Sequence, residues 1–183
     1  PKNKVVGMAG ILDSSRFKYF LSQELKVKVD QIKTLVLGGH GDTMVAMIDH
    51  TFVEKKPLGD FIKSEKLKKE KLEEIVNRTK KGGAEIVKYL EKGSAFYAPA
   101  ASGVEMAESY LRDLKKQLPC AAYLNGEYGA KDLYAGVPVQ IGKNGVEKVI
   151  EINLSEVEKK QFDNSIKAVQ ELFKAAKKID NNL

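Results

Sequence analysis

Hydrophobic residues recur at helical spacing near the start of the chain and again before its middle. Residues 11–25 predict a helix whose apolar positions are Leu12, Phe17, Phe20, Leu21 and Leu25. Residues 66–92 predict an amphipathic helix whose apolar positions are Leu72, Ile75, Val76, Ile86, Val87 and Leu90. Within this second helix, Gly82–Gly83 is expected to mark a kink or a junction.

Two further helices are predicted in the second half of the chain. Residues 93–119 form the first, with Pro99 in its first turn and Pro119 just past its end. The other begins at "NLSEVE", where Ser155 and Glu158 have the spacing of a capping box. Its expected buried positions are Phe162, Ile166, Val169, Phe173 and Ala176.

Between these helices the pattern changes to short apolar runs that are typical of strands. Residues 34–39 predict a buried strand ending in glycine, and residues 43–53 predict more extended chain. Residues 120–129, 135–142 and 146–152 predict three more strands, and "KNG" joins the last two as a hairpin with Asn-Gly at its tip. No βαβ unit repeats, so the pattern predicts an α+β fold with long helices packed on an antiparallel sheet.

Composition and charge narrow the class of protein. The 183 residues, 43% hydrophobic and 31% charged, are expected to form one domain, 1–183. The net charge is +6, but lysines alternate with acids, as in "KSEKLKKEKLEE", so no nucleic acid is expected as a partner. No apolar run approaches the roughly 20 residues of a membrane span, so no membrane is expected either. The single cysteine, Cys120, excludes an internal disulfide and fits a buried, inert thiol in a reducing compartment.

The first candidate for chemistry is a histidine in the glycine-rich stretch "LVLGGHGDTMV", residues 35–45. His40, one of two histidines in the chain, lies between glycines at the end of a predicted strand. Glycines let the backbone turn sharply and let a ligand approach closely. An imidazole presented there can transfer protons near neutral pH; alternatively, it is an ordinary turn residue. The stretch lacks both G-x-G-x-x-G and G-x-x-x-x-G-K-[ST], so no phosphate cradle is expected.

The second candidate is "LDSSRF", where Asp13 and Arg16 are three positions apart at the start of a predicted helix. At that spacing both side chains lie on one helix face. One interpretation is an N-cap aspartate with a surface ion pair. The other is that Arg16 binds a substrate carboxylate through its planar guanidinium, while Asp13 supports a charged histidine.

A metal site is the third possibility weighed. His40, Asp42, Asp49 and His50 lie within eleven positions. No H-x-x-x-H pair or cysteine cluster accompanies them, so no metal is expected.

Three segments, "GMAGILDSSRF", "GGHGDTMV" and "GSAFYAPAAS", follow one another in the chain. In this order and spacing they closely resemble the carboxyl-terminal half of the lactate/malate dehydrogenase family, and most closely its bacterial malate dehydrogenases that are built like lactate dehydrogenase. The resemblance extends over essentially the whole chain.

The resemblance implies a role for each candidate. His40 matches the histidine that accepts the hydroxyl proton as hydride leaves the substrate carbon for the nicotinamide. Asp13 matches the aspartate that orients this imidazole, and Arg16 matches the arginine that binds the substrate carboxylate. Met8 and Ala9 match positions that contact the cofactor. Ser94 and Ala95 match positions that line the pocket.

The resemblance also implies an activity. It indicates an NAD-dependent malate dehydrogenase, an oxidoreductase of the tricarboxylic acid cycle that interconverts malate and oxaloacetate, working as a cytoplasmic homodimer or homotetramer. NAD would be bound mainly by an N-terminal Rossmann domain that is expected to be absent from this chain, so residues 1–183 alone are expected to be inactive. A lactate dehydrogenase and a non-catalytic assembly domain remain the alternatives.

Overall fold

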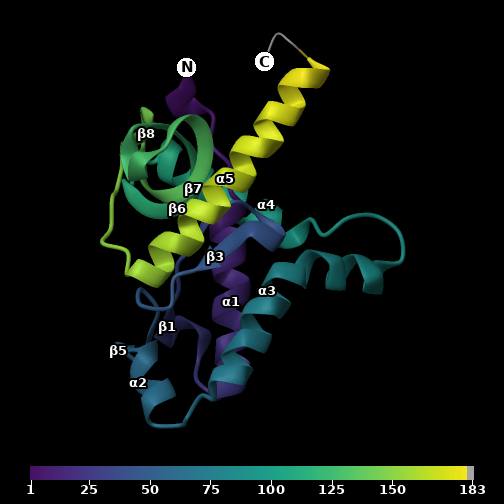
Figure 1. Ribbon diagram of the computed structural model, residues 1–183, viewed down its shortest axis with the longest axis vertical. Coiled ribbons are helices and arrows are strands. Elements are labelled where there is room, and N and C mark those ends of the chain that lie inside the picture. The colour runs from purple at the N-terminus through teal and green to yellow at the C-terminus, as the bar shows by residue number, and fades with distance from the viewer. Residues whose placement is uncertain (181–183) are drawn as a thin grey trace.

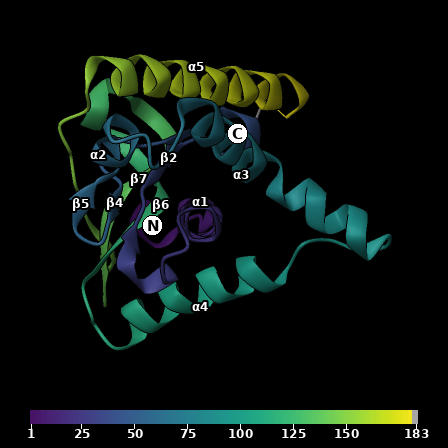
Figure 2. The same ribbon diagram turned by 90° about the horizontal axis from the view of Figure 1, so that it is seen from below.

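The structure is a computed structural model that describes residues 1–180. The last positions of the predicted domain, 181–183, lie outside the described residues. Figure 2 shows α5 (Glu156–Ile179) along one side of the molecule and α4 (Tyr97–Leu111) along the opposite side. The strands and α1 (Ala9–Leu25) lie between them. Helices therefore cover an antiparallel sheet, which confirms the predicted fold class.

The main sheet has the strand order β3-β2-β7-β6, and β8 pairs with β7. Its long hairpin joins β6 (Lys116–Asn125) to β7 (Lys131–Gly142) through η4 (Glu127–Gly129). Its remaining strands are β2 (Val36–Gly38), β3 (Met44–Ala46) and β8 (Gly145–Val149). All pairs are antiparallel. In the predicted hairpin between β7 and β8, Gly142 pairs with Gly145, so the tip is Lys143–Asn144 and not the expected Asn144–Gly145.

A small second sheet has the order β1-β4-β5. It consists of β1 (Ile32–Lys33), β4 (Phe52–Val53) and β5 (Lys56–Pro57), and α2 (Leu58–Lys63) follows it. Short helical turns η1 (Lys2–Lys4), η2 (Val29–Gln31) and η3 (Gly41–Thr43) lie elsewhere in the first quarter of the chain. The predicted extended segment 43–53 is thus divided between β3 in one sheet and β4 in the other.

Helix α1 connects two hydrophobic clusters. Ile11 belongs to the cluster between the main sheet and α5, which includes Phe162. Phe17 and Leu21 belong to a second cluster formed with the small sheet and the first half of α3 (Lys69–Leu90). Burying such side chains stabilises a fold by about 1.5–3 kcal/mol each. The segment of α1 between these anchors, residues 12–16, is therefore held firmly against β2 and α3.

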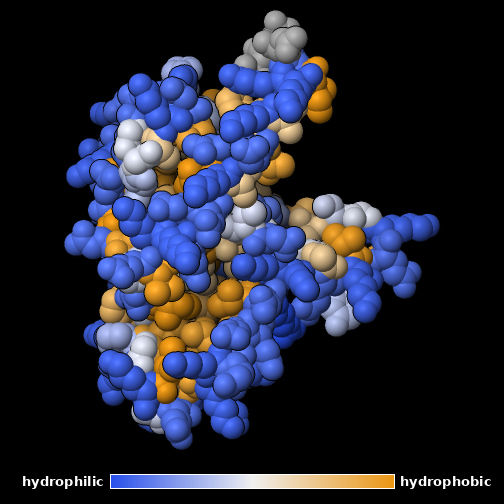
Figure 3. Space-filling model, in the orientation of Figure 1, coloured by the Kyte–Doolittle hydropathy of each residue, from blue (hydrophilic) through white to orange (hydrophobic). Residues whose placement is uncertain are grey.

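Helix α3 is slightly shorter than the predicted helix 66–92, and its second half is more exposed than an amphipathic pattern predicts. Its first half buries Leu72 and Ile75, but Ile86, Val87 and Leu90 are exposed. In Figure 1 the second half of α3 and the following loop project away from the molecule as an arm, and Figure 3 shows apolar surface on that arm. The helix continues without interruption through Gly82–Gly83, and its ribbon changes direction partway along.

The predicted helix 93–119 is wrong at both ends. The observed helix, α4, covers only Tyr97–Leu111, with Pro99 in its first turn. Pro119, expected just past the helix, lies inside β6 and pairs with Pro138 of β7. Pairing of 116–125 with β7 outweighs the helical pattern of "YLRDLKKQL", because strand propensity depends on tertiary partners. The missing N–H of Pro119 costs little here, because opposed residues in an antiparallel pair that do not exchange hydrogen bonds direct their N–H groups away from each other.

Helix α5 begins as the sequence predicts. The Ser155 hydroxyl accepts a hydrogen bond from the Glu158 N–H, and the Glu158 carboxylate accepts one from the Ser155 N–H. Phe162 and Ile166 are buried, whereas Phe173 is exposed, which corrects the predicted stripe. The last turns of α5 extend beyond the main sheet (Figure 2), so Phe173 lies outside the core and is covered only in part, by Lys177 over its ring.

The structure also bears on the predictions about Cys120 and about membrane-spanning segments. Cys120 is free and buried, and burial raises its pKa to about 12, so the thiol is inert as predicted. Within residues 1–180, no helix is both long enough and apolar enough to span a bilayer.

Candidate active site

Asp13 and Arg16 lie in the second turn of α1. The helix begins at Ala9 with Met8 as its N-cap residue, so Asp13 is well inside the helix and is not its cap. This position overturns the N-cap interpretation of Asp13. The Asp13 side chain is only 2% exposed, and burying a carboxylate is costly unless a charged or hydrogen-bonding partner compensates it. Its surroundings therefore indicate what the carboxylate does.

His40 is delivered by a sharp turn at the end of β2. Gly38 has φ of +83°, a conformation that favours glycine, and a Cβ there would overlap the Ser165 side chain. His40 follows as the N-cap residue of η3, with extended backbone. The glycines around the histidine thus allow a backbone path that brings its side chain toward α1.

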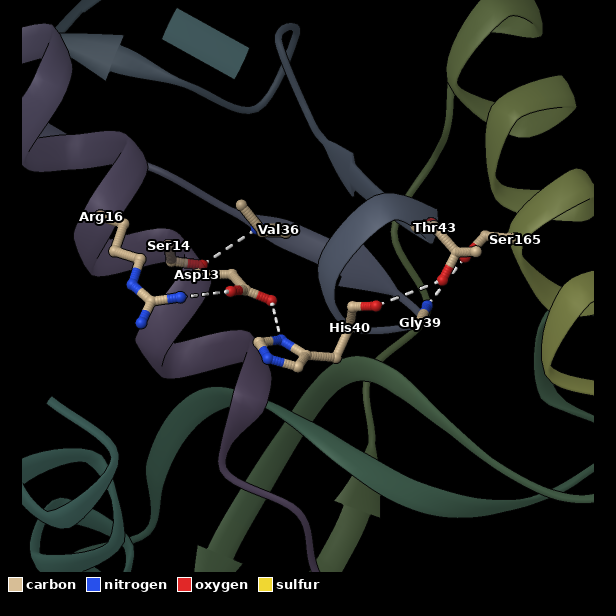
Figure 4. A network of polar contacts seen from close by, with 8 residues as sticks. All are labelled: Asp13, Ser14, Arg16, Val36, Gly39, His40, Thr43 and Ser165. Carbon is tan, nitrogen blue, oxygen red and sulfur yellow. Dashed lines mark hydrogen bonds and ion pairs between the residues drawn. The ribbon is translucent and has the colours of Figure 1, made fainter. Parts of the chain in front are cut away.

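The imidazole of His40 and the carboxylate of Asp13 are hydrogen-bonded. Nδ1 of His40 lies 2.8 Å from Oδ2 of Asp13, and a dashed line marks this contact in Figure 4. An ionised carboxylate can only accept, so Nδ1 carries the hydrogen of this bond. In the neutral imidazole, Nε2 is then left as the proton acceptor. The His40 side chain is 54% exposed, so the ring can meet a ligand while its other nitrogen is held by a buried acid.

The pKa of His40 is raised above the ordinary value of 6.5. The largest cause is the hydrogen bond to Asp13, and the Asp13 charge acts in the same direction. Partial burial and the nearby charge of Arg16 oppose the increase. The site therefore favours an imidazolium, the product of a proton transfer to His40.

Arg16 presents a cation beside this pair. Its Nη1 lies 3.9 Å from Oδ1 of Asp13, and its side chain is 11% exposed. Within the described part of the chain, the buried Nε of Arg16 has no hydrogen-bond partner. The guanidinium packs on α3 at Gly82, where a Cβ would lie 3.0 Å from Arg16 Cδ. Because Gly82 lacks a Cβ, the arginine fits against α3 with its positive charge beside the His40–Asp13 pair.

A cavity of about 170 Å³ lies against the His40–Asp13 pair. Its walls come from α1, the end of β2, β7 and α5, and the lining residues include Ala9, Gly39, Tyr134 and Val169. Met8 adjoins it as the N-cap residue of α1 but does not line it. Ser94 and Ala95 lie in the loop between α3 and α4 and also do not line it.

A larger groove of about 560 Å³ runs between α3 and α5. It is lined by Thr43, Asn77, Lys80 and Asn164 among others, and none of His40, Asp13 or Arg16 contributes to it. The smaller cavity is therefore the candidate active site, because it is lined by His40, whose pKa is raised, and by Asp13, although Arg16 does not line it.

The four residues weighed as metal ligands do not face one another. His40 contacts Asp13, whereas His50 lies with its Nδ1 3.4 Å from Oε2 of the buried Glu158. The Asp49 N–H donates to the same glutamate. Residues 1–180 contain no group of three or more His, Cys, Asp or Glu side chains arranged to hold a metal ion.

Two serines that the sequence pattern does not single out form hydrogen bonds with the backbone beside the site. The Ser14 hydroxyl accepts a hydrogen bond from the Val36 N–H and so ties α1 to β2. The Ser165 hydroxyl contacts the backbone on both sides of His40 (Figure 4). Ser165 could have been noticed as the polar position in an apolar stripe, since it lies between Phe162 and Ile166 on the buried face of α5.

Comparison with known proteins agrees with this geometry. Residues 11–181 match the family described as lactate/malate dehydrogenase, alpha/beta C-terminal domain. The chain is 66% identical over all 183 residues to the malate dehydrogenase of Pelagibacter ubique. It spans 57% of the length of that relative.

Solved structures of similar proteins superpose closely. The malate dehydrogenase of Cryptosporidium parvum has a TM-score of 0.93 and 46% identity, covering 97% of this chain and 57% of that one. The lactate dehydrogenase of the same organism, complexed with lactic acid and nicotinamide adenine dinucleotide, has a TM-score of 0.92 and 44% identity, covering 96% and 55%.

The antiparallel fold and the family match thus define a carboxyl-terminal domain of the lactate/malate dehydrogenase type. The chain belongs to the lactate/malate dehydrogenase family.

Proposed function

We propose that this chain is the substrate-binding and catalytic part of an NAD-dependent malate dehydrogenase, which interconverts malate and oxaloacetate. The observation that carries the proposal is the 2.8 Å contact between His40 and the buried Asp13, with the cation of Arg16 beside it. This arrangement combines a proton acceptor, an acid that stabilises its charged form, and a donor for a carboxylate.

In malate oxidation, Nε2 of His40 takes the proton of the substrate hydroxyl, and Asp13 stabilises the imidazolium that forms. The substrate carboxylate binds Arg16 in bidentate fashion, which fixes the hydroxyl near His40. In the reverse direction, protonated His40 returns its proton to the carbonyl oxygen of oxaloacetate.

NAD, when bound, supplies the acceptor for the hydride that leaves the substrate carbon. The residues present fit one end of such a cofactor. Ala9, with only a methyl side chain, and Gly10, with none, line the His40 cavity and leave room for the flat nicotinamide, and Met8 adjoins them. The sequence contains no phosphate cradle, so the remainder of the cofactor would be held outside residues 1–183.

The choice of malate over lactate rests on the sequence relatives. The 66% identical Pelagibacter ubique protein and a 54% identical protein of Methylobacterium radiotolerans are both malate dehydrogenases. The similar solved structures include enzymes of both kinds, so the fold alone does not separate them.

We also propose that residues 1–183 act as one domain and that the protein works as a homodimer or homotetramer in the cytoplasm. The position of α1 in both hydrophobic clusters supports a single domain. Exposed apolar side chains at the end of α3, in the following loop and at the start of α4 support assembly; they include Tyr89, Phe96 and Tyr97. Sedimentation velocity tests the proposed assembly, and a monomer at micromolar concentration would contradict it.

The test of activity uses a chimera in which this chain replaces the corresponding segment of the Pelagibacter ubique enzyme. NADH oxidation is compared with oxaloacetate and with pyruvate, and oxaloacetate is expected to be turned over faster. A chimera carrying His40→Asn is expected to be folded but inactive, and residues 1–183 alone are expected to be inactive as well. Faster turnover of pyruvate would replace malate by lactate as the substrate. A folded chimera that is silent with both, beside an active parent enzyme, would refute the proposed function.

A further inference from the structure

Ser165 contacts the catalytic loop from a distant part of the sequence. Its hydroxyl accepts a hydrogen bond of 2.8 Å from the Gly39 N–H and donates one of 2.6 Å to the Thr43 carbonyl oxygen. Both partners are backbone groups, and Ser165 is only 3% exposed. One buried hydroxyl therefore joins the two ends of a five-residue loop whose second residue is His40 (Figure 4).

The backbone around the loop is shaped for this contact. Gly38 has no Cβ where the Ser165 side chain passes, and its φ of +83° turns the chain into the loop. A Cβ on Gly39 would overlap the Thr43 hydroxyl and touch Val169 of α5 at 3.4 Å. The close approach of loop and helix thus depends on two consecutive glycines and one small polar side chain.

Helix α5 is fixed in the two turns that precede Ser165. Phe162, one turn earlier, and Glu158, two turns earlier, are both buried on the same face. Phe162 packs in the main core, and Glu158 accepts a hydrogen bond from the Asp49 N–H beyond β3. Ser165 is therefore presented by a rigid support.

We propose that Ser165 is a positioning residue, which clasps residues 39–43 so that His40 stays aligned with Asp13 for proton transfer. The proposal rests on the proposed function of His40, and it acts through the backbone, since Ser165 does not touch the imidazole. Without the clasp, Gly39 N–H and Thr43 C=O lose their partner and the loop gains freedom. His40 then spends only part of its time within hydrogen-bond distance of Asp13, and displacements of about 1 Å can cost large factors in rate.

The chain contains a matched control for a purely structural effect. Ser109 of α4 is fully buried, and its hydroxyl likewise accepts from one backbone N–H, that of Lys116, and donates to one backbone carbonyl, that of Ile141. Ser109→Ala removes the same kind of bridge away from His40. An effect on the site that appears in Ser165→Ala but not in Ser109→Ala is therefore specific to the clasp.

The first measurement is the titration of the His40 imidazole by NMR in the 183-residue protein. Only His40 and His50 give imidazole signals, so a His50→Gln variant assigns them. The groups that face His40 are Asp13 and Arg16 of α1 and Tyr134 across the cavity. In Ser165→Ala the pKa of His40 is expected to move down toward its ordinary value, because the Asp13 hydrogen bond is made less often. Ser109→Ala is expected to leave the His40 titration unchanged.

A titration of His40 in Ser165→Ala that coincides with the unsubstituted protein would overturn the proposal. Thermal denaturation checks that each variant is folded. Should Ser165→Ala unfold, Ser165→Cys replaces it, since it has nearly the same volume but only a weak hydrogen-bonding group, and the same shift is expected.

The second measurement uses the Pelagibacter ubique chimera. Ser165→Ala is expected to lower kcat for oxaloacetate reduction about tenfold, with KM within about twofold, because Arg16 still binds the carboxylate. Ser109→Ala is expected to change neither. A raised KM with unchanged kcat would overturn the positioning role. If the unsubstituted chimera shows no turnover, the proposed function fails, and the titration alone decides whether Ser165 positions His40.

Discussion

Replacing Asp13 by asparagine removes the charge that faces His40 and leaves a side chain of nearly the same size. The amide oxygen of asparagine can still accept from Nδ1–H of His40, so the 2.8 Å contact is expected to survive. The hydrogen bond then changes from charge-assisted to neutral, and the imidazolium loses its buried counter-charge. The variant therefore isolates the electrostatic part of the pair.

The magnitude follows from the geometry. A hydrogen bond to a charged group contributes about 1.5–3 kcal/mol, and the lower part of that range applies because the His40 side chain is 54% exposed. A loss of about 1.5–2 kcal/mol of stabilisation of the imidazolium corresponds to a decrease of roughly 10- to 30-fold in kcat for malate oxidation. The pKa of His40, which the Asp13 hydrogen bond raises, is expected to fall.

Two assays check this expectation. NMR titration of His40 in the 183-residue protein follows the pKa, and steady-state oxidation of malate by the Pelagibacter ubique chimera follows kcat. Asp42→Asn is the control, since Asp42 is an exposed acid two positions from His40 that does not contribute to its raised pKa. If Asp13→Asn left both the His40 pKa and kcat unchanged, the pairing of His40 with Asp13 would have no catalytic role.

Three further predictions concern the same site. Arg16→Lys is expected to raise KM for oxaloacetate at least about tenfold, with a smaller effect on kcat, because an ammonium cannot replace the bidentate guanidinium. An unchanged KM in steady-state assays would mean that Arg16 only forms a structural ion pair. Gly82→Ala is expected to raise KM as well, because its Cβ would lie 3.0 Å from Arg16 Cδ. Gly83→Ala is the control: its Cβ would lie 3.7 Å from the guanidinium nitrogens, so little effect on KM is expected. Equal KM values for the two variants would contradict this prediction. Because the pKa of His40 is raised on folding, its contribution to stability is full below its ordinary pKa of 6.5 and is lost as pH rises through the folded value. Oxaloacetate reduction, which needs protonated His40, is expected to decline over that same rise in a pH–rate profile, and a profile flat through it would exclude His40 as the proton donor.

Local patterns in the sequence anticipate much of the fold. Residues 11–25 form a helix whose apolar positions are buried or partly buried, and the Ser155–Glu158 capping box starts the last helix. Both depend on neighbours within a few positions in the chain. Pro119 and Phe173 were placed wrongly for the opposite reason. Whether residues 116–125 form a strand depends on β7, and whether Phe173 is buried depends on how far the sheet extends beneath α5.

The candidate site divides in a similar way. His40, Asp13 and Arg16 each stand out by residue type and local spacing, and support of a charged histidine by Asp13 is one of two interpretations that this pattern allows. The local pattern does not decide between them, because His40 and Asp13 are 27 positions apart. The family resemblance favours the pairing, and the geometry agrees with it. Ser165 is 126 positions from Gly39. Its polar side chain in an apolar stripe could mark it as unusual, but the sequence does not show that it contacts the His40 loop.

The long separation between Ser165 and the loop that it holds has a consequence for how the protein folds. Contacts between residues far apart in the chain carry the largest loop-closure cost and slow folding. Synthesis delivers the pieces in a fixed order, with α1 and the His40 loop emerging long before α5. The histidine and its aspartate can thus meet in a nascent chain, but the loop between Gly39 and Thr43 is fastened only when the final helix docks. The geometry of the candidate site is therefore complete only after α5 has been synthesised and has docked.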